Sequence, residues 1–370
     1  MPPTPRPTAP APRELPAQMT AVLTQGHGGY EQLDYRTDVP LPVPGPEDVL
    51  VRVGAAGINN TDINTRIGWY SSSVRGATDE RDGPAADLGL VHGWMGTPQQ
   101  FPRIQGADVC GRIIAAGPAV VAARLGERVL VQCSLRSLKR GDVMPFLGSE
   151  RDGGFAQYVA VPAADAFAVH SALSDAELAS FPCAYGTAEN LLARCRVEPG
   201  ERVLVTGASG GVGSAAVQLA ARRGAIVVAI AGPDKAAQVR ALGASQVIAR
   251  GENLIPLVGG ESIDAVIDVV GGPSWGELLD VLRRHGRYAA SGAIAGPIVE
   301  LDLRKLYLKD LSFHGCTDLD EGVFANLIGY IERGEVRPLV ARSYPLADIA
   351  LAQREFLAKR YVGKLVLLPP

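Results

Sequence analysis

The sequence lacks any block of like charge and any long apolar run. Its 36 basic and 39 acidic residues give a net charge of −3 and are spread along the 370-residue chain. We therefore expect no nucleic acid among its partners, because nucleic-acid sites are strongly basic. No stretch of about 18 apolar residues occurs either, so the sequence predicts no membrane-spanning helix and no membrane partner.

Cysteine is scarce, and its spacing argues against two kinds of scaffold. The five cysteines, an odd number, stand at positions 110, 133, 183, 195 and 316. Neither a disulfide framework nor a zinc ribbon is expected, because both need closely spaced cysteines. We interpret these residues as reduced core thiols of a cytoplasmic protein. The five histidines show no metal-binding spacing, and we predict no metal site.

The N-terminus lacks the apolar stretch of a signal peptide. Residues 1–18 are rich in proline and alanine, which predicts a disordered tail. From residue 19 to residue 183, short β-rich runs are broken by glycine and proline, which is typical of a compact antiparallel, barrel-like domain. The predicted strands are 19–25, 48–55, 108–115, 128–133 and 155–161.

One segment of this region has a different composition. Residues 71–100 are polar and rich in glycine, and they include His92 and Trp94. A loop of this length inside a compact domain usually has a function. A lid or a pocket wall is one interpretation of the segment.

From residue 184 to residue 317, apolar strands alternate with helical stretches. This alternation predicts right-handed βαβ units around a parallel sheet. The expected strands are 203–206, 226–230, 245–248, 265–269 and 287–291, and the expected helices include 213–224 and 236–242. Residues 318–370 then offer two helices, near 321–333 and 346–359, and a last strand, 363–368.

The most informative segment is a glycine-rich loop between an apolar strand and a helix. Gly207 permits the tight turn, Gly210 lets the backbone approach a pyrophosphate, and Gly213 lets the helix pack closely on the sheet. The start of the helix offers unpaired N–H groups to the phosphate. The predicted dinucleotide contacts in this loop come from Gly207, Ser209, Gly210, Gly211, Val212 and Gly213.

The residues after the second strand of this unit favour NADPH. Strand 226–230 ends in Ala231, Gly232 and Pro233, without the acid that would bind the ribose hydroxyls and repel a 2′-phosphate. Two cations, Lys235 and Arg250, follow the second and third strands and could bind that phosphate. The alternative is that both are solvated surface residues.

Several motifs together resemble the medium-chain dehydrogenase/reductase superfamily, and within it the zinc-free quinone-oxidoreductase-like branch. The motifs are the glycine loop and the segments 56–62, 106–111, 153–158 and 361–364. The resemblance implies an α/β protein with a GroES-like β-barrel-type catalytic domain, residues 19–183 and 318–370. It also implies a Rossmann doubly wound parallel-sheet domain, residues 184–317.

The resemblance also implies that a catalytic zinc is missing. In zinc-dependent members the ligand positions hold Cys, His and Cys, and here they hold Asn59, Ala107 and Pro182, with Cys183 one step further on. A catalytic zinc site needs three protein donors, which these residues do not supply. An unorthodox site built from Asp108, Cys183 and His92 stays an alternative.

Without a metal, reduction depends on placing a hydride about 3–3.5 Å from an electrophilic carbon and on donors for the developing oxyanion. Delocalised acceptors such as enones and quinones suit that chemistry. By resemblance, Asn59 is a candidate oxyanion donor, Tyr70 a candidate enolate or proton group, and Thr61 a relay hydroxyl, while Asn64 adds polarity. The alternative for Asn59 is a backbone-satisfying turn residue, and for Tyr70 a packing residue. Asp62 is expected to bind local backbone or Arg66.

The resemblance places two further loops beside the nicotinamide. Their residues are Val270, Gly271, Ser291, Gly292 and Ala293, where bulky side chains would occupy the ring's space. Lys364 is a further expected cofactor contact. Residues 311–316 resemble the edge strand through which such proteins form homodimers, since an unpaired edge needs a cover.

Three functions stay open at this point. The first is zinc-independent, NADPH-dependent reduction of a small electrophile, either an activated alkene or a quinone. The second is a related zinc-free oxidoreductase acting on an enoyl thioester or on an alcohol or aldehyde. The third is a nucleotide-binding scaffold without catalysis, which the glycine loop cannot separate from the first because both bind the cofactor.

Overall fold

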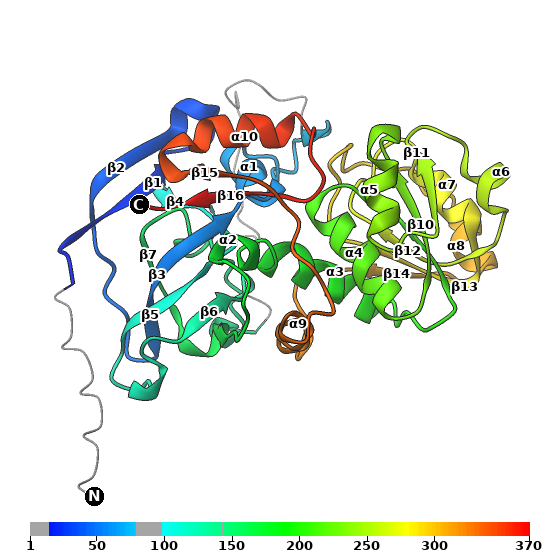
Figure 1. Cartoon of the computed structure of the whole chain (residues 1–370). Coiled ribbons are helices and arrows are strands. Elements are labelled where there is room, and N and C mark those ends of the chain that lie inside the picture. Colours follow the sequence, from blue (N-terminus) through cyan, green and yellow to red (C-terminus); the bar gives the residue numbers. More distant parts are fainter. Residues whose placement is uncertain (1–14, 79–97, 142–143) are drawn as a thin grey trace, which may run out of the picture.

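The computed structural model describes residues 15–78, 98–141 and 144–370. They form two bodies, with the N-terminal and C-terminal segments together in one and the middle of the chain in the other (Figure 1). No helix within these residues is long and apolar enough to cross a lipid bilayer. Most of the expected tail, residues 1–14, lies outside the described part, and the first strand begins at Gln18.

The first body, the barrel domain, is built from two mainly antiparallel sheets. The larger has the order β15-β16-β3-β5-β6-β8 with β7 paired to β3, and the smaller has the order β2-β1-β4. Only β15 and β16 pair in parallel in these sheets. The strands are β1 (Gln18–Thr24), β2 (Leu33–Pro40), β3 (Asp48–Gly57), β4 (Arg103–Ile104), β5 (Cys110–Ala116), β6 (Arg128–Val131), β7 (Tyr158–Pro162), β8 (Ala166–Ala168), β15 (Val340–Pro345) and β16 (Lys364–Leu368). The predicted barrel-like architecture is confirmed.

Strand β3 shows why the barrel domain folds this way. Val49, Val51 and Val53 share one face and enter a common apolar core, while Arg52 between them is exposed. Alternation of this kind buries one face of a strand. Helix α10 (Ile349–Leu357) covers the same core with Ile349 and is drawn across the top of this body in Figure 1.

The second body, the parallel-sheet domain, holds six parallel strands in the order β11-β10-β9-β12-β13-β14. The chain starts at the centre and fills first one side and then the other, so the order reverses between β9 and β12. Ligands of such sheets bind at that switch point, beyond the carboxyl ends of the strands. The strands are β9 (Arg202–Val205), β10 (Ile226–Ala231), β11 (Gln246–Ala249), β12 (Ile263–Asp268), β13 (Leu282–Ala290) and β14 (Ser312–Gly315), and the helices are α4 (Gly211–Arg222), α5 (Ala236–Ala241), α6 (Leu254–Val258), α7 (Trp275–Val281) and α8 (Leu303–Leu308). The predicted parallel sheet is confirmed.

Helix α3 (Pro182–Arg194) runs between the two bodies (Figure 1). It packs against α4 and against α9 (Val323–Glu332). One hydrophobic core includes Ala55 and Leu130 of the barrel domain together with Val203 of the parallel sheet. The two bodies therefore share buried apolar surface. Two short helices complete the barrel domain, α1 (Asn60–Arg66) and α2 (Asp175–Leu178).

The segment 71–100 is only partly described. Residues 79–97, with His92 and Trp94, lie outside the described residues, so the expected lid or pocket wall stays a prediction. The start of the segment does reach the other body, because Thr78 N–H donates to Ile294 O at 3.0 Å.

Candidate active site

The glycine loop has the geometry that a bound pyrophosphate needs. Gly207 has a φ of +57°, and a Cβ on Gly213 would lie 2.2 Å from Gly207 O, so only glycine allows the turn and the helix to meet. The N-cap of α4, Gly210, has no side chain to cap the helix. The helical hydrogen bonds begin with the one from Ser214 N–H to Gly210 O. The preceding N–H groups of the first turn are left for a ligand. The residues present therefore fit a dinucleotide phosphate.

The two loops expected beside the nicotinamide lie against each other. Ala295 N–H donates to Val270 O at 2.9 Å, and a Cβ on Gly271 would lie 3.0 Å from Gly296 O. The turn that holds Val270 and Gly271 therefore contacts the turn that follows Ser291, Gly292 and Ala293. The close backbone approach explains why small residues occur here.

Asp268 fixes the first of these loops and escaped the sequence analysis. This fully buried carboxylate accepts hydrogen bonds from the hydroxyls of Thr206 (2.6 Å) and Tyr288 (2.7 Å) and from Val270 N–H (2.9 Å). Burial, together with the negative charge of Asp268, raises the pKa of Tyr288 and keeps that hydroxyl a donor. An acid at the end of a mostly apolar, mostly buried strand, β12, was the available signal.

The two predicted phosphate-binding cations lie at the ends of neighbouring strands. Ala231 of β10 pairs with Ala249 of β11, and Arg250 N–H donates to Ala231 O at 3.0 Å. The Arg250 side chain is exposed, whereas Lys235 is buried and its ammonium donates to the carbonyl of Lys359. Both cations thus follow the carboxyl ends of β10 and β11, and one of them, Lys235, already contacts the barrel domain.

The four predicted catalytic residues lie on helix α1 or close to its ends. Asn59 is its N-cap and forms a capping box with Asp62. The Tyr70 hydroxyl is hydrogen-bonded to the side chains of Thr61 and Asn64, and burial raises its pKa, so it stays protonated. Among the described residues, the buried Asn64 Oδ1 has no hydrogen-bond partner. An unsatisfied buried oxygen of this kind is costly unless a ligand or water pairs with it.

Asp62 is fully buried behind Asn59 and does not pair with Arg66. It accepts Asn59 N–H at 2.8 Å and Gly106 N–H at 3.2 Å, as expected for a residue that binds local backbone. Burial raises its pKa to about 7. The expected alternative, a pair with Arg66, is wrong, because the Arg66 guanidinium donates instead to Gly28 O and Gln353 Oε1.

A lysine ammonium lies beside Asn59. Lys364 Nζ is 2.5 Å from Asn59 Oδ1 and 2.7 Å from Asp108 Oδ2, and the side chains of Lys364 and Asp108 are 3% and 0% exposed. Asn59 Nδ2 donates to the same Asp108 oxygen at 2.9 Å. Gly57 makes room for the carboxylate, since a Cβ there would lie 2.4 Å from Asp108 Oδ2. Sequence reasoning missed this ion pair, which joins residues 256 positions apart.

The structure corrects the assignment of the third zinc-ligand position. The residue whose side chain packs with Ala107 is Cys183, in a small buried cluster with Cys133 and Phe146. The expectation that Pro182 holds this position is therefore off by one residue. A hydrogen bond with Cys133, followed by burial, raises the pKa of the Cys183 thiol well above its ordinary value. No group of three or more potential metal-binding side chains occurs in the residues that the structure describes.

Contacts between the bodies bring these parts together. Tyr70 and Ala293 pack against the same apolar cluster, which contains Ile63 and Trp69. Gly363 N–H donates to Ser209 O at 3.1 Å, which fixes the start of β16 against the glycine loop. The predicted catalytic residues of α1 are therefore close to a predicted nicotinamide loop.

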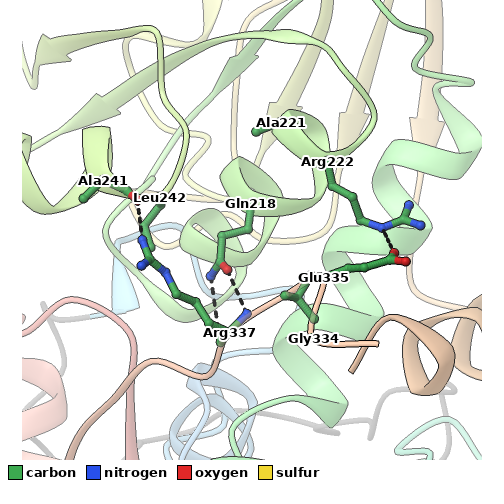
Figure 2. Close-up of a pocket in the computed structure, with 9 residues that line it drawn as sticks. Gln218, Ala221, Arg222, Ala241, Leu242, Gly334, Glu335 and Arg337 are labelled. Carbon is green, nitrogen blue, oxygen red and sulfur yellow. Dashed lines mark hydrogen bonds and ion pairs between the residues drawn. The ribbon is translucent and has the colours of Figure 1, made fainter. Parts of the chain in front are cut away.

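A groove of about 580 Å³ lies elsewhere, where α4 and α5 meet the segment after α9 (Figure 2). Its polar groups bind one another. Arg222 pairs with Glu335 at 2.5 Å, Gln218 Oε1 accepts Arg337 N–H at 3.1 Å, and the Arg337 guanidinium donates to Ala241 O. The groove lies toward the C-terminal end of α4, whereas the glycine loop is at its start, and the hydrogen bonds within its lining are those of a structural junction.

Comparisons with known proteins agree with this architecture. Family models match residues 45–171 (alcohol dehydrogenase GroES-like domain) and 211–333 (zinc-binding dehydrogenase). The structure of a candidate alcohol dehydrogenase from Sinorhizobium meliloti 1021 is 47% identical, with a TM-score of 0.86 over 96% of this chain and 98% of that one. A quinone oxidoreductase from Lama guanicoe is 29% identical over 95% of this chain and 97% of its own length. An acryloyl-coenzyme A reductase from Metallosphaera sedula is 28% identical over 94% and 99%.

Extensive coverage of both chains at 47% identity establishes the family. The chain belongs to the medium-chain dehydrogenase/reductase superfamily, as an oxidoreductase whose Rossmann-like domain binds a nicotinamide nucleotide.

Proposed function

We propose that this oxidoreductase works without zinc, uses NADPH, and reduces an activated alkene or a quinone by hydride transfer. The Lys364 ammonium between Asn59 and Asp108 carries the proposal. Asn59 and Ala107 correspond to two ligand positions of zinc-dependent relatives. The Asn59 oxygen already accepts from the ammonium, and Ala107 has no donor atom. A catalytic zinc needs about three protein ligands, which this set does not provide.

The edge of the parallel sheet supports NADPH as the cofactor. No acid closes β10, and Lys235 and Arg250 lie at the carboxyl ends of adjacent strands. A 2′-phosphate at these strand ends would meet two cations, and the acid nearest in sequence, Asp234, comes only after Gly232 and Pro233.

The bound dihydronicotinamide would supply a hydride, and the protein residues would orient the acceptor and stabilise its charge. Tyr70, Thr61 and Asn64 form a hydroxyl and amide network near the nicotinamide loop. In this network the Asn64 oxygen is available to accept a hydrogen bond. Acceptors whose charge delocalises through a conjugated system suit a site without a metal Lewis acid.

The proposal is tested by steady-state NADPH oxidation with a panel of a cyclic enone, a quinone, an enoyl thioester and an aldehyde, together with zinc analysis of the same preparation. We expect turnover of the enone or the quinone, NADPH preferred to NADH, and far less than one zinc per chain. Stoichiometric zinc with chelator-sensitive aldehyde turnover would overturn the proposal in favour of a zinc-dependent alcohol dehydrogenase. Tight NADPH binding without turnover of any acceptor would establish the scaffold alternative.

The similarity to an acryloyl-coenzyme A reductase favours an enoyl thioester as the second candidate substrate. A thioester conjugated with an alkene accepts hydride at the same β-carbon as an enone. The ratio of kcat/KM for the thioester and the enone decides between them, because a dedicated thioester enzyme would use binding energy from the coenzyme A portion.

We further propose a homodimer formed through β14. This strand is an edge of the six-stranded sheet, and Phe313 on it is 37% exposed. The neighbouring helix α8 exposes Leu303, Tyr307 and Leu308, at 57–63% each. An open edge next to apolar side chains is stabilised when a second copy covers it.

A further inference from the structure

The hydrogen bonds of the Asn59 side chain are already used within the protein. Its amide nitrogen donates to Asp108 Oδ2 at 2.9 Å and points toward Gly57 O at 3.4 Å, and its oxygen accepts from Lys364. An asparagine amide has two N–H donors, and both are directed at protein acceptors here. Asn59 therefore has no donor left for a substrate oxygen in this arrangement.

Asp108 is occupied in the same way. Its Oδ1 accepts Cys183 N–H at 2.6 Å, and its Oδ2 is shared by Asn59 and Lys364. The lysine ammonium has three N–H bonds, and the structure records two acceptors for it, Asn59 Oδ1 and Asp108 Oδ2. Of the three side chains in this cluster, Lys364 is the one with a donor to offer.

We infer that Lys364 is the catalytic residue that binds the substrate's carbonyl oxygen, with Asn59 and Asp108 as its positioning residues. The inference rests on the proposed function and names the group that replaces the metal cation in it. A fixed ammonium shielded from water stabilises a developing oxyanion more strongly than it would in bulk water.

The step balances without a further co-reactant. An enone accepts a hydride at its β-carbon, where a C–H bond forms and the C=C π bond breaks. The electron pair moves to the carbonyl oxygen, giving an enolate that accepts an N–H hydrogen bond from Lys364. A proton from solvent then reaches the α-carbon and restores the C=O bond. The enone is reduced by one hydride and one proton while NADPH is oxidised to NADP⁺.

Stability alone is a weak reason for this ion pair. Moving two charges out of water costs free energy that their attraction often does not recover, and well-packed apolar residues of similar volume are often as stable or more so. The cluster is also built specifically, since a Cβ on Gly57 would clash with the Asp108 carboxylate. These features fit a cation that is held in place for chemistry.

The competing role for Lys364 is a contact with the cofactor phosphate. Its stem passes the glycine loop, where a Cβ on Gly211 would lie 3.1 Å from Lys364 Cδ. A different rotamer could therefore direct the same ammonium to the pyrophosphate. The two roles differ in what its removal changes, since one affects the chemical step and the other affects NADPH affinity.

The Lys364→Met variant separates them. We expect kcat for the enone to fall by about a hundredfold to a thousandfold, as when one oxyanion donor is removed. The dissociation constant of NADPH, measured by quenching of protein fluorescence, should change by less than about threefold. A rise of about tenfold or more in that constant, with kcat at saturating NADPH retained, would assign Lys364 to the phosphate and overturn the inference.

Two variants control for loss of folding. Lys364→Met leaves the buried Asp108 carboxylate without its cationic partner, so Lys364→Met/Asp108→Asn removes both charges and should fold well while keeping the loss of kcat. Lys309→Met is the matched control, because that ammonium lies away from the site, is 14% exposed, and donates to three backbone carbonyls, those of Leu279, Asp280 and Leu282. We expect it to lower stability and to leave kcat unchanged. Recovery of kcat in the double variant would overturn the inference.

A binding measurement makes the result independent of turnover. The probe is 4-nitrophenol, whose anion resembles an enolate and absorbs visible light differently from the neutral phenol. With NADP⁺ present, the wild type should bind it as the anion, and Lys364→Met should bind it neutral or not at all. Anion binding that is equal in both would overturn the inference. If no acceptor is turned over but the wild type alone binds the anion, the proposed function fails and the role of Lys364 stands.

Discussion

Asp62 illustrates how one buried carboxyl can shape the pH dependence of the whole protein. Burial raises its pKa to about 7 from an ordinary value of 3.8, although Asn59 N–H and Lys364 partly oppose the shift. The folded protein therefore keeps a proton that the unfolded chain releases between about pH 4 and pH 7. The protonated Asp62 carboxyl therefore contributes roughly 4 kcal/mol to the free energy of unfolding below pH 3.8, and this contribution is lost as the pH rises to about 7.

The Asp62→Asn variant should remove this dependence. We expect it to be less stable than the wild type near pH 5, because an amide offers one acceptor oxygen to the N–H groups of Asn59 and Gly106 where the carboxyl offers two. Its stability relative to the wild type should rise from about pH 5 to pH 7 and level off above that, because the variant has no charge to bury. Urea unfolding at several pH values measures the difference.

The matched control for Asp62 is Asp152→Asn. Asp152 also accepts a backbone N–H, from Ile104 at 3.1 Å, but its side chain is 55% exposed. We expect its stability relative to the wild type to stay constant over the same pH range. A constant difference for Asp62→Asn as well would show that the Asp62 carboxyl is already ionised at pH 5.

At this scale the sequence predicted residue types better than pairings. Thr61 and Asn64 lie on α1, and Tyr70, four residues after the end of that helix, is hydrogen-bonded to both, which their short sequence spacing makes possible. The contact of Lys364 with Asp108 and Asn59 could not be predicted, because it depends on β16 returning to pair with β3 at the other end of the chain. The role of Asp268 depends likewise on Tyr288 from a neighbouring strand.

At the scale of elements, β14 is the clearest case for an experiment. Phe313→Glu places a charge in the middle of the proposed dimer edge, where it would be buried against the second copy. We expect the variant to be monomeric at concentrations at which the wild type is dimeric, because an unpaired buried charge is strongly unfavourable. Sedimentation velocity measures the oligomeric state.

The control for β14 is Val121→Glu, at a valine that is 67% exposed on the barrel domain. It adds the same charge to the surface and should leave the dimer intact. Phe313 also packs against Tyr288 at a ring distance of 5.3 Å, so cooperative unfolding of the variant must be checked by circular dichroism. A folded Phe313→Glu variant that still dimerises would move the interface elsewhere.

The sequence predicted most of the long buried strands and missed two exposed ones, β2 and β15. Strands β9, β10, β11, β12 and β13 and helix α4 were predicted because apolar runs and glycines mark them, whereas β14 was expected from the family resemblance. Strand β2 was missed because most of its residues are exposed and it carries charges at Asp34, Arg36 and Asp38. Strand β15 is exposed in the same way, and it forms because β16 pairs with it.

At the scale of the molecule, the two bodies are linked beside the carboxyl ends of β10 and β11, where we expect the 2′-phosphate of the cofactor to bind. The Lys235 ammonium donates to the carbonyl of Lys359, whose own ammonium donates to Asn60 Oδ1 at 3.0 Å, at the start of α1. A cofactor phosphate bound by Lys235 would therefore lie next to the contact that joins the parallel-sheet domain to the barrel domain. Ligands that bind only the folded state stabilise it, by about 2.7 kcal/mol at a concentration one hundred times the dissociation constant.

The double variant Lys235→Ala/Arg250→Ala should lose this stabilisation for NADPH and keep it for NADH. Charge-assisted hydrogen bonds contribute about 1.5–3 kcal/mol each, so removing two of them should lower NADPH affinity by about a hundredfold or more. NADH has no 2′-phosphate, and its affinity should be nearly unchanged. Thermal unfolding with each cofactor measures both affinities.

Arg240→Ala, which removes an exposed arginine of α5, serves as the control and should alter neither affinity. Equal weakening of both cofactors by the double variant would mean that Lys235 stabilises the junction between the domains and does not select the phosphate.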